Sequence, residues 1–217
     1  MKFDASVTSE LLDGMRHAKQ TIARAGLIVL PTDTVYGIGC DAFSAFAVNS
    51  LLEAKGRGRQ SPPPVLIPSL DTLRALTSDP PQLAFTLAEK FWPGALTLIL
   101  RAQPSLNWDL GETRGTVALR MPNNELALAL LKEVGPLAVS SANLTGQPAA
   151  SNIDEAENYF GTKVGVYLDG GPAPSSKPST ILDLTEDGQV KVVRLGVLSI
   201  AQIKKCLGRE TEVVVAD

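Results

Sequence analysis

The segment "LIVLPTDTVYGIGCDA" (residues 27–42) joins a short apolar run to a turn that is rich in hydroxyl groups. The run at residues 27–30 is typical of a strand that is buried on both faces. A proline and an aspartate should end this strand, so that the turn presents Thr32, Thr34 and Tyr36 near the strand end. Ligands of open α/β sheets bind in the crevice at strand ends. The turn is therefore a candidate site, and the alternative is a bulge or turn whose hydroxyls satisfy local backbone groups.

Strand and helix patterns alternate through the first two-thirds of the chain, which predicts an α/β fold with a mixed sheet and flanking helices. Further strands are expected at residues 65–67, 95–100, 116–121, 137–141, 164–169, 179–184 and 190–195. Helices are expected at residues 8–26, 44–56, 80–92, 124–134, 153–160 and 199–207. The last two strands, joined by "TEDGQ", predict a hairpin. We expect one domain over residues 1–207 and a loosely packed C-terminal tail over residues 208–217.

The composition narrows the class of protein. The chain has 217 residues, of which 44% are hydrophobic and 20% charged, so it can bury a sizeable core. Its net charge of −3 argues against a dedicated DNA-binding protein, because such proteins are usually basic. The two cysteines match no metal spacing, and no apolar run is long enough for a membrane span. We therefore expect a cytoplasmic protein with no membrane contact.

The segment "AKGRGRQSPPP" (residues 54–64) gathers cations in a loop that cannot be regular structure, because three prolines follow one another. Lys55, Arg57 and Arg59 lie within five residues, and the glycines between them let the backbone approach a ligand closely. Lysine supplies a point charge, and arginine supplies a planar fork that suits phosphate. The segment indicates a clamp for a polyanion, and a solvated basic loop is the alternative.

Small polar side chains follow another expected strand in "AVSSANLTG" (residues 138–146). Ser141 and Asn143 can donate there to a carboxylate or phosphate, although an ST-turn or helix cap would use the same residues. Arg120 lies inside an apolar strand and needs a partner, because burying an unpaired charge is costly. Two later strand boundaries add further polar candidates, Ser179, Thr180 and Arg194.

Two familiar chemistries are disfavoured. The segment "GIGCDA" (residues 37–42) matches G-x-G-x-x-A, but no acidic residue follows at the distance that a dinucleotide site requires. His17, the only histidine in the sequence, lies off the apolar stripe of its helix and is expected to be exposed, so no Ser-His-Asp triad can be written. Cys40 lacks a histidine base and is expected to be a small core residue. A site in this chain should act by positioning and electrostatics.

Together, these segments resemble the YrdC-like threonylcarbamoyl-AMP synthases of tRNA modification. The matching blocks, in the order of that family, are "PTDTVYGIGCDA" (31–42), "LLEAKGRGRQSPPPVLI" (51–67), "FWPGALTLIL" (91–100), "TVALRMP" (116–122), "AVSSANLTGQP" (138–148), "STILDL" (179–184) and "VVRLG" (192–196). The Lys-x-Arg at 55–57 and the Ser-x-Asn at 141–143 resemble the paired signature of the family. One block would be weak support, but seven in order are strong.

The resemblance implies a single YrdC-like catalytic domain with a twisted mixed sheet and a deep, positively charged cavity. It implies that L-threonine, bicarbonate or CO2, and ATP give threonylcarbamoyl-AMP and pyrophosphate, with Mg²⁺ accompanying ATP. A partner complex would then transfer the threonylcarbamoyl group to the adenosine at position 37 of tRNA, and direct contact with tRNA is a further expectation.

The resemblance also assigns roles to residues of this chain. It implies a threonine-binding set of Thr34, Arg120, Ser141 and Ser179. It implies an ATP-binding set of Lys55, Arg57, Ser61, Thr116, Asn143, Ser151 and Arg194. The catalytic group would be Lys55, Arg57, Ser141 and Asn143, and no protein side chain is expected to ligate a metal, since ATP holds the Mg²⁺. The chain departs from many relatives at Ser61, where they have Asn or Lys, and from some relatives at Leu66 and Asn124, where they have His.

Two other functions could use the same fold. A double-stranded RNA-binding module would need a broad basic face, and the acidic balance of this chain argues against one. A carbamoyl-transfer accessory domain would use carbamoyl phosphate and would come with extra domains, which we do not expect in a sequence of this length.

Overall fold

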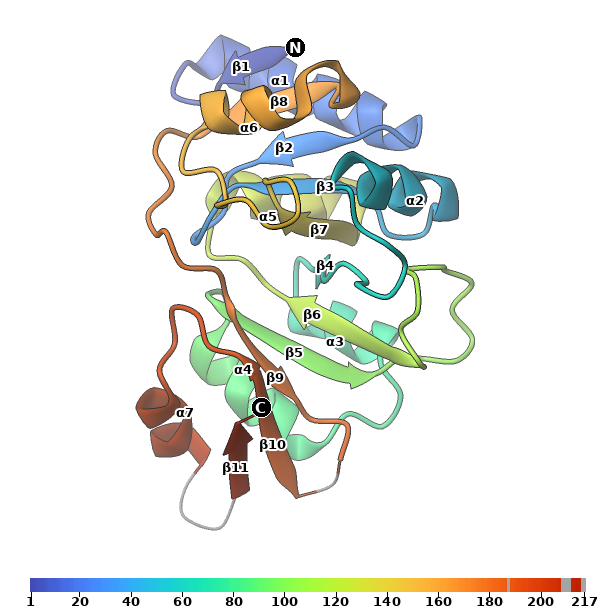
Figure 1. Ribbon diagram of the computed structural model, residues 1–217, viewed down its shortest axis with the longest axis vertical. Coiled ribbons are helices and arrows are strands. Elements are labelled where there is room, and N and C mark those ends of the chain that lie inside the picture. Colours follow the sequence, from blue (N-terminus) through green and yellow to red (C-terminus); the bar gives the residue numbers. More distant parts are fainter. Residues whose placement is uncertain (187, 208–211, 216–217) are drawn as a thin grey trace.

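The computed structural model describes residues 1–186, 188–207 and 212–215. Within these residues the strands form one 11-stranded sheet that extends along the molecule in Figure 1. Its strand order is β1-β8-β2-β3-β7-β4-β6-β5-β9-β10-β11. The sheet is mixed, because β8 pairs in parallel with β1 and β2, whereas β3 pairs antiparallel with β2 and β7. The expected α/β class with a mixed sheet is confirmed.

The element bounds agree with most of the ranges expected from the sequence. The strands are β1 (Lys2–Asp4), β2 (Ile28–Leu30), β3 (Gly37–Asp41), β4 (Val65–Leu66), β5 (Leu96–Arg101), β6 (Thr116–Arg120), β7 (Leu137–Ser141), β8 (Val166–Asp169), β9 (Thr180–Asp183), β10 (Gln189–Arg194) and β11 (Glu212–Val215). The helices are α1 (Thr8–Ala23), α2 (Ala45–Ala54), α3 (Leu70–Leu76), α4 (Gln82–Phe91), α5 (Glu125–Val134), α6 (Ile153–Phe160) and α7 (Ile200–Leu207), with a 3-10 turn η1 (Gly161–Lys163). The expected hairpin is the antiparallel pair β9 and β10.

The inner strands β2 and β3 are buried on both faces, as the unbroken apolar strand at 27–30 predicts, whereas β1, β10 and β11 carry exposed residues. Successive side chains of a strand point to opposite faces. Ile28 and Leu30 accordingly belong to one apolar cluster, together with residues of α1 and α5, whereas Val29 belongs to a second cluster that includes residues of α2, α4 and α6. The two layers of helices in Figure 1 therefore cover opposite faces of the sheet.

The interrupted strand at 27–42 is a hairpin. β2 ends at Leu30, and β3 returns beside it, with Leu30 opposite Gly37. β3 was not among the expected strands, because glycines weaken a strand pattern. Close approach of β7 explains them, since a Cβ atom at Gly37 or Gly39 would lie 2.6 or 2.7 Å from a methyl carbon of Val139. The glycines of "GIGCDA" thus serve strand packing.

Four further differences separate the structure from the expectations. The first helix ends at Ala23, three residues before the expected end, and its N-cap is Val7, without a side-chain cap. α3 was missed, although Ser69 caps it by accepting a hydrogen bond from the Thr72 amide at 3.3 Å. β1 was also missed. In the expected loose tail, β11 pairs in parallel with β10, and the remaining positions of that tail lie outside the described residues. No described helix has the length and apolar character of a membrane span.

Candidate active site

One pocket, with a cavity volume of about 270 Å³, gathers most of the polar residues singled out in the sequence. It lies where the β2–β3 turn meets β6, β7, β9 and β10. Seven of the expected residues line it: Thr34, Arg57, Thr116, Arg120, Ser141, Ser179 and Arg194. Among the described lining residues, the three arginines are the only charged ones. The pocket is therefore suited to anions, as the expected positive cavity requires.

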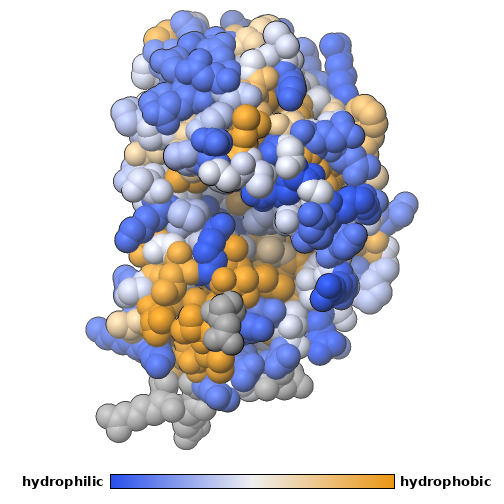
Figure 2. Space-filling view, viewed as in Figure 1, coloured by the Kyte–Doolittle hydropathy of each residue, from blue (hydrophilic) through white to orange (hydrophobic). Residues whose placement is uncertain are grey.

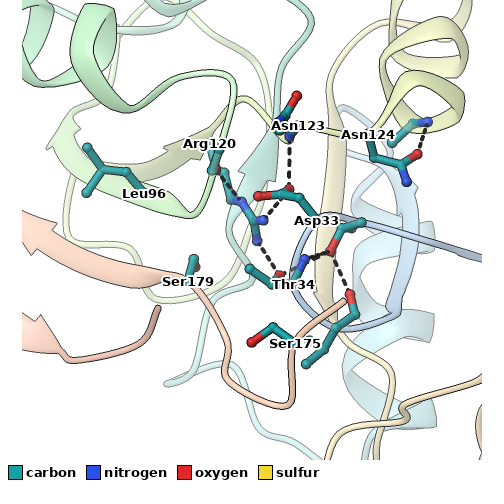
Figure 3. A network of polar contacts seen from close by, with 12 residues as sticks. Asp33, Thr34, Leu96, Arg120, Asn123, Asn124, Ser175 and Ser179 are labelled. Carbon is teal, nitrogen blue, oxygen red and sulfur yellow. Dashed lines mark hydrogen bonds and ion pairs between the residues drawn. The ribbon is translucent and has the colours of Figure 1, made fainter. Parts of the chain in front are cut away.

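The floor of the pocket holds a buried ion pair between Arg120, at the end of β6, and Asp33, in the β2–β3 turn. The Arg120 Nη2 atom donates to Asp33 Oδ1 at 2.6 Å, and its Nη1 atom donates to Thr34 Oγ1 at 3.0 Å (Figure 3). A third bond, from Nε to the Gly94 carbonyl, is 3.0 Å long. Burial lowers the pKa of Arg120, and the Asp33 carboxylate opposes that shift.

These contacts leave Arg120 with spare donors. A guanidinium has five N–H groups, and the described residues accept from three of them. One N–H on each terminal nitrogen therefore remains, and either can donate to an anionic ligand in a charge-assisted hydrogen bond. Asp33 also accepts from the Asn123 amide at 2.9 Å, so the acid is itself held in place.

The other two arginines have no acidic partner among the described residues. Arg57 donates to Ser140 Oγ at 3.3 Å, and Arg194 donates to the Ser179 carbonyl from Nη2 at 2.9 Å and from Nε at 3.2 Å. Burial, followed by the charges of Arg120 and Arg57, lowers the pKa of Arg194. Three cations thus repel one another in one pocket, and an anionic ligand would relieve this repulsion.

Hydroxyl groups complete the polar half of the pocket. Thr34 Oγ1 lies 3.1 Å from Thr32 Oγ1, and Ser179 Oγ lies 2.8 Å from Thr97 Oγ1. Ser141 differs, because its Oγ makes no hydrogen bond to another described residue and is free to meet a ligand. β10 contributes one apolar side chain, Val193, and one cation, Arg194, to the lining. On the outer surface, Figure 2 shows apolar side chains gathered over the region of β10.

Several site residues could not be assigned from the sequence. Asp33 and Thr97 take part in the pocket network but were not among the candidates, and Thr32 was a candidate of the turn to which no ligand was assigned. The signal for Asp33 was available, because Arg120 in an apolar strand required a partner. The hydroxyls of Thr32 and Tyr36 were expected to be exposed, but these residues are 5% and 1% exposed.

Lys55 does not lie in the expected loop. It is 1% exposed, and its ammonium group donates to the carbonyl oxygens of Ser141 and Asn143. It does not line the pocket, so contact with a phosphate would require it to leave these carbonyls. Burial therefore rules out the alternative of a solvated basic loop for Lys55, and its contact with phosphate stays a prediction.

Three other expected ligands lie outside the pocket lining. Ser61 sits in a turn in which its amide donates to the Gly58 carbonyl at 3.2 Å. The hydroxyl of Ser151, which is exposed, donates to Glu155. Asn143 is buried, and its Oδ1 is a side-chain acceptor with no partner among the described residues. A ligand that reached Asn143 would find this acceptor unused.

The positions that depart from the relatives have simple structural roles. Leu66 is buried in β4 and lines the pocket with an apolar surface. Asn124 caps α5, because its Oδ1 accepts from the Ala127 amide at 3.0 Å.

A family model described as telomere recombination, which represents the Sua5, YciO and YrdC proteins, matches residues 20–196. The chain belongs to this family. The resemblance found in the sequence is thereby confirmed, and the match includes the turn, the basic segment and every arginine of the pocket.

Individual relatives extend the match. A Mycobacterium leprae protein provisionally named threonylcarbamoyl-AMP synthase is 50% identical over 206 residues, which are 95% of this chain and 93% of that protein. The crystal structure of Pyrococcus abyssi Sua5 complexed with L-threonine has a TM-score of 0.89 at 33% identity, and the match covers 98% of this chain and 62% of that one. Escherichia coli YciO has a TM-score of 0.79 at 28% identity, with 87% of this chain and 92% of that chain covered.

The two residues that could suggest covalent or acid–base chemistry lie outside the pocket of this family member. His17 was expected to be exposed but is only partly exposed, and it stacks on Phe3 with ring centroids 5.1 Å apart. Cys40 is completely buried in β3. Burial, and then the nearby Asp41 carboxylate, raises the pKa of the Cys40 thiol to about 12, so it is a poor nucleophile.

We expect His17→Gln and Cys40→Ala each to keep turnover within about tenfold, a barrier change of ~1.4 kcal/mol. Neither side chain lines the pocket, so neither can touch a reacting atom there. The measurement is product formation by the folded variants, with circular dichroism as the control for folding. A loss of several orders of magnitude in a folded variant would show that this expectation is wrong.

Proposed function

We propose that this chain is an enzyme that makes threonylcarbamoyl-AMP and pyrophosphate from L-threonine, bicarbonate or CO2, and ATP. The observation that carries the proposal is the convergence of three arginines in one pocket, two of them without an acidic partner among the described residues. The substrates are a carboxylate, a carbamate precursor and a triphosphate, so the site must hold several negative charges at once. The relative from Pyrococcus abyssi complexed with L-threonine supports this choice of amino acid.

The proposed chemistry needs positioning more than covalent work by the protein. The threonine amine attacks CO2, or bicarbonate with loss of water, and gives a carbamate. A carbamate oxygen then attacks the α-phosphorus of ATP, and the bond from that phosphorus to pyrophosphate breaks. Because two anions must approach each other, fixed cations near the reacting phosphorus should lower the barrier.

The site residues divide between the two substrates in this proposal. The threonine carboxylate accepts a hydrogen bond from a spare N–H group of Arg120, which places the amino acid beside Thr34, Ser141 and Ser179. The triphosphate lies against Arg57 and Arg194, with Thr116 on the same wall. Ser61, Ser151 and Asn143 could join the nucleotide only at the edge of the pocket, since they do not line it.

Mg²⁺ enters the proposal as part of the ATP substrate. The described residues contain no group of three or more His, Cys, Asp or Glu side chains suited to a metal ion. The charged lining of the pocket is arginine, which fits phosphate oxygens. When bound, Mg²⁺ would neutralise phosphate charge, and the chain would supply the remaining cations.

In this proposal, a second enzyme system uses the product. Threonylcarbamoyl-AMP is a reactive mixed anhydride, so a partner complex that transfers the threonylcarbamoyl group to tRNA would have to follow. ATP and tRNA place the proposed reaction in the cytoplasm. Direct contact between this chain and tRNA remains part of the proposal.

The test is pyrophosphate release by the purified chain with ATP and Mg²⁺, with and without threonine and bicarbonate. Release that requires both co-substrates is the expected result. RNA binding with a steep salt dependence and no ATP turnover would contradict the proposal and favour an RNA-binding module.

We expect kcat/KM to fall in the order threonine, serine, valine. Serine lacks only a methyl group, which costs roughly 10–200-fold, whereas a missing hydroxyl in a site built to bond it costs ~10⁴-fold or more. Among the hydroxyls of Thr34, Ser141 and Ser179, only that of Ser141 makes no hydrogen bond to another described residue. Ser141→Ala should therefore narrow the gap in kcat/KM between threonine and valine. The measurement is pyrophosphate release with each amino acid at saturating ATP and bicarbonate. Valine matching serine would show that the pocket selects shape and not the hydroxyl.

A further inference from the structure

Lys55 is placed unusually for the lysine of a proposed phosphate site. It follows the last residue of α2 and is 1% exposed. Its Nζ donates to the carbonyl oxygen of Asn143 at 2.7 Å and to that of Ser141. Burial and the nearby charge of Arg57 both disfavour its charged form, and it makes no ion pair with a described residue. Two backbone carbonyls are therefore its partners among the described residues.

The backbone carbonyl of Lys55 contacts the same segment of the chain that its ammonium group contacts. The Lys55 carbonyl accepts from both the amide and the hydroxyl of Thr145, each at 3.0 Å. The segment of residues 141–145, which we call the 141–145 loop, is thus fixed at both of its ends by one residue. These contacts join positions 86 to 90 residues apart in the sequence.

The 141–145 loop carries the end of β7 into the pocket. Ser141 is the last residue of that strand and lines the pocket with an unused hydroxyl. Buried carbonyls that lose their donors cost free energy until the backbone moves to find others. A loop without Lys55 should therefore shift, and the Ser141 hydroxyl should shift with it.

We propose that Lys55 is a positioning residue, which acts on the reaction through Ser141 by holding the 141–145 loop, and does not itself contact the anionic substrate. The inference rests on the proposed function, because it assigns a role in that same pocket. It also separates the two members of the Lys-x-Arg pair, since Arg57 lines the pocket and Lys55 does not.

The protonation of Lys55 fits this role. Burial, and then the Arg57 charge, lowers the pKa of Lys55 to about 7. A neutral amine still has two N–H groups, which is the number that the two carbonyls need. Positioning therefore survives the loss of the proton, whereas attraction of a phosphate would be lost with the charge.

The first test is a double-mutant cycle between Lys55→Met and Ser141→Ala, read as kcat/KM for threonine in pyrophosphate release. Methionine keeps the length and apolar stem but has no donor. In the wild-type background we expect Lys55→Met to lower kcat/KM by roughly 10–100-fold, and in the Ser141→Ala background by no more than about twofold. Equal losses in the two backgrounds would overturn the proposal. Lys90→Met, on the exposed side of α4, is the matched control and should be unchanged.

The second test is calorimetric binding of pyrophosphate, which probes the phosphate site without turnover. Arg57→Ala should weaken binding by roughly tenfold or more, because it removes charge-assisted hydrogen bonds. Lys55→Met should stay within about twofold of wild type, which is the scatter of independent sites. A loss as large as that of Arg57→Ala would mean that Lys55 meets phosphate directly, and the proposal would be wrong.

Two further measurements test the role of Lys55 if the first variant does not fold or if the proposed function is wrong. If Lys55→Met does not fold, Lys55→Gln replaces it, because a neutral amide retains two N–H donors on a side chain one bond shorter. Retained activity in this uncharged variant supports positioning, and loss of pyrophosphate affinity overturns it.

If the wild-type chain releases no pyrophosphate, the proposed function fails. Hydrogen exchange then decides the inference, since faster exchange confined to the 141–145 loop in the variant supports it and unchanged exchange contradicts it.

Discussion

Replacing Arg120 by glutamine should lower kcat/KM for threonine by roughly 10³-fold or more, because the substrate carboxylate loses its charged partner. The same change should lower the free energy of unfolding by about 3–5 kcal/mol, since it leaves the Asp33 carboxylate buried without its cation. The side chains of Arg120 and Asp33 are 8% and 15% exposed, so water would replace the lost contact only in part. The measurements are pyrophosphate release and denaturant unfolding.

The double variant Asp33→Asn/Arg120→Gln separates the two effects. Removing both charges should recover part of the lost stability, because no unpaired charge remains buried. It should not recover activity, because the donors for the carboxylate are still absent. Activity of Arg120→Gln within tenfold of wild type would show that the pocket does not bind the threonine carboxylate at Arg120.

Replacing Arg57 or Arg194 by alanine should each cost roughly 10²–10³ in turnover, which is the usual effect of removing one preorganised electrostatic partner. Both variants should remain folded, because neither arginine has an acidic partner among the described residues that would be left unpaired. Arg57→Lys keeps the charge and loses the planar fork, so it should recover only part of the loss. The measurement is pyrophosphate release at saturating substrates.

Arg74→Ala is the matched control for the loss of a positive charge. Arg74 is an exposed residue of α3 that pairs with Asp71 at 3.0 Å, and surface pairs of this kind contribute less than about 1 kcal/mol. Its turnover should equal that of wild type. Full activity in Arg57→Ala or Arg194→Ala would contradict the assignment of these residues to the phosphates.

The sequence by itself determined the class of fold and seven of the polar residues that line the pocket. Apolar runs such as 27–30 and the alternation with helical patterns depend on local periodicity, which a single segment contains. Polar residues at the ends of such runs, and the cations of the basic segment after α2, were recognisable for the same reason. Thr34, Arg57, Arg120, Ser141 and Arg194 do line one pocket. β3 was not predicted, because its glycines are required by the close approach of Val139 on β7. A local sequence pattern does not contain this contact.

Only the tertiary structure decided which partner each polar residue takes. Asp33 and Arg120 are 87 residues apart in the sequence, and their pairing arises because the β2–β3 turn and the end of β6 meet at the pocket. Lys55 and Arg57 look equivalent in the sequence, yet one donates to buried carbonyls and the other lines the pocket. The end of α2 sets the direction of each side chain there, and the 141–145 loop supplies acceptors to only one of them. Hydrogen bonding and burial depend on groups from distant segments of the chain. The sequence therefore identified candidate residues, and the packing of the sheet determined which partner each of them contacts.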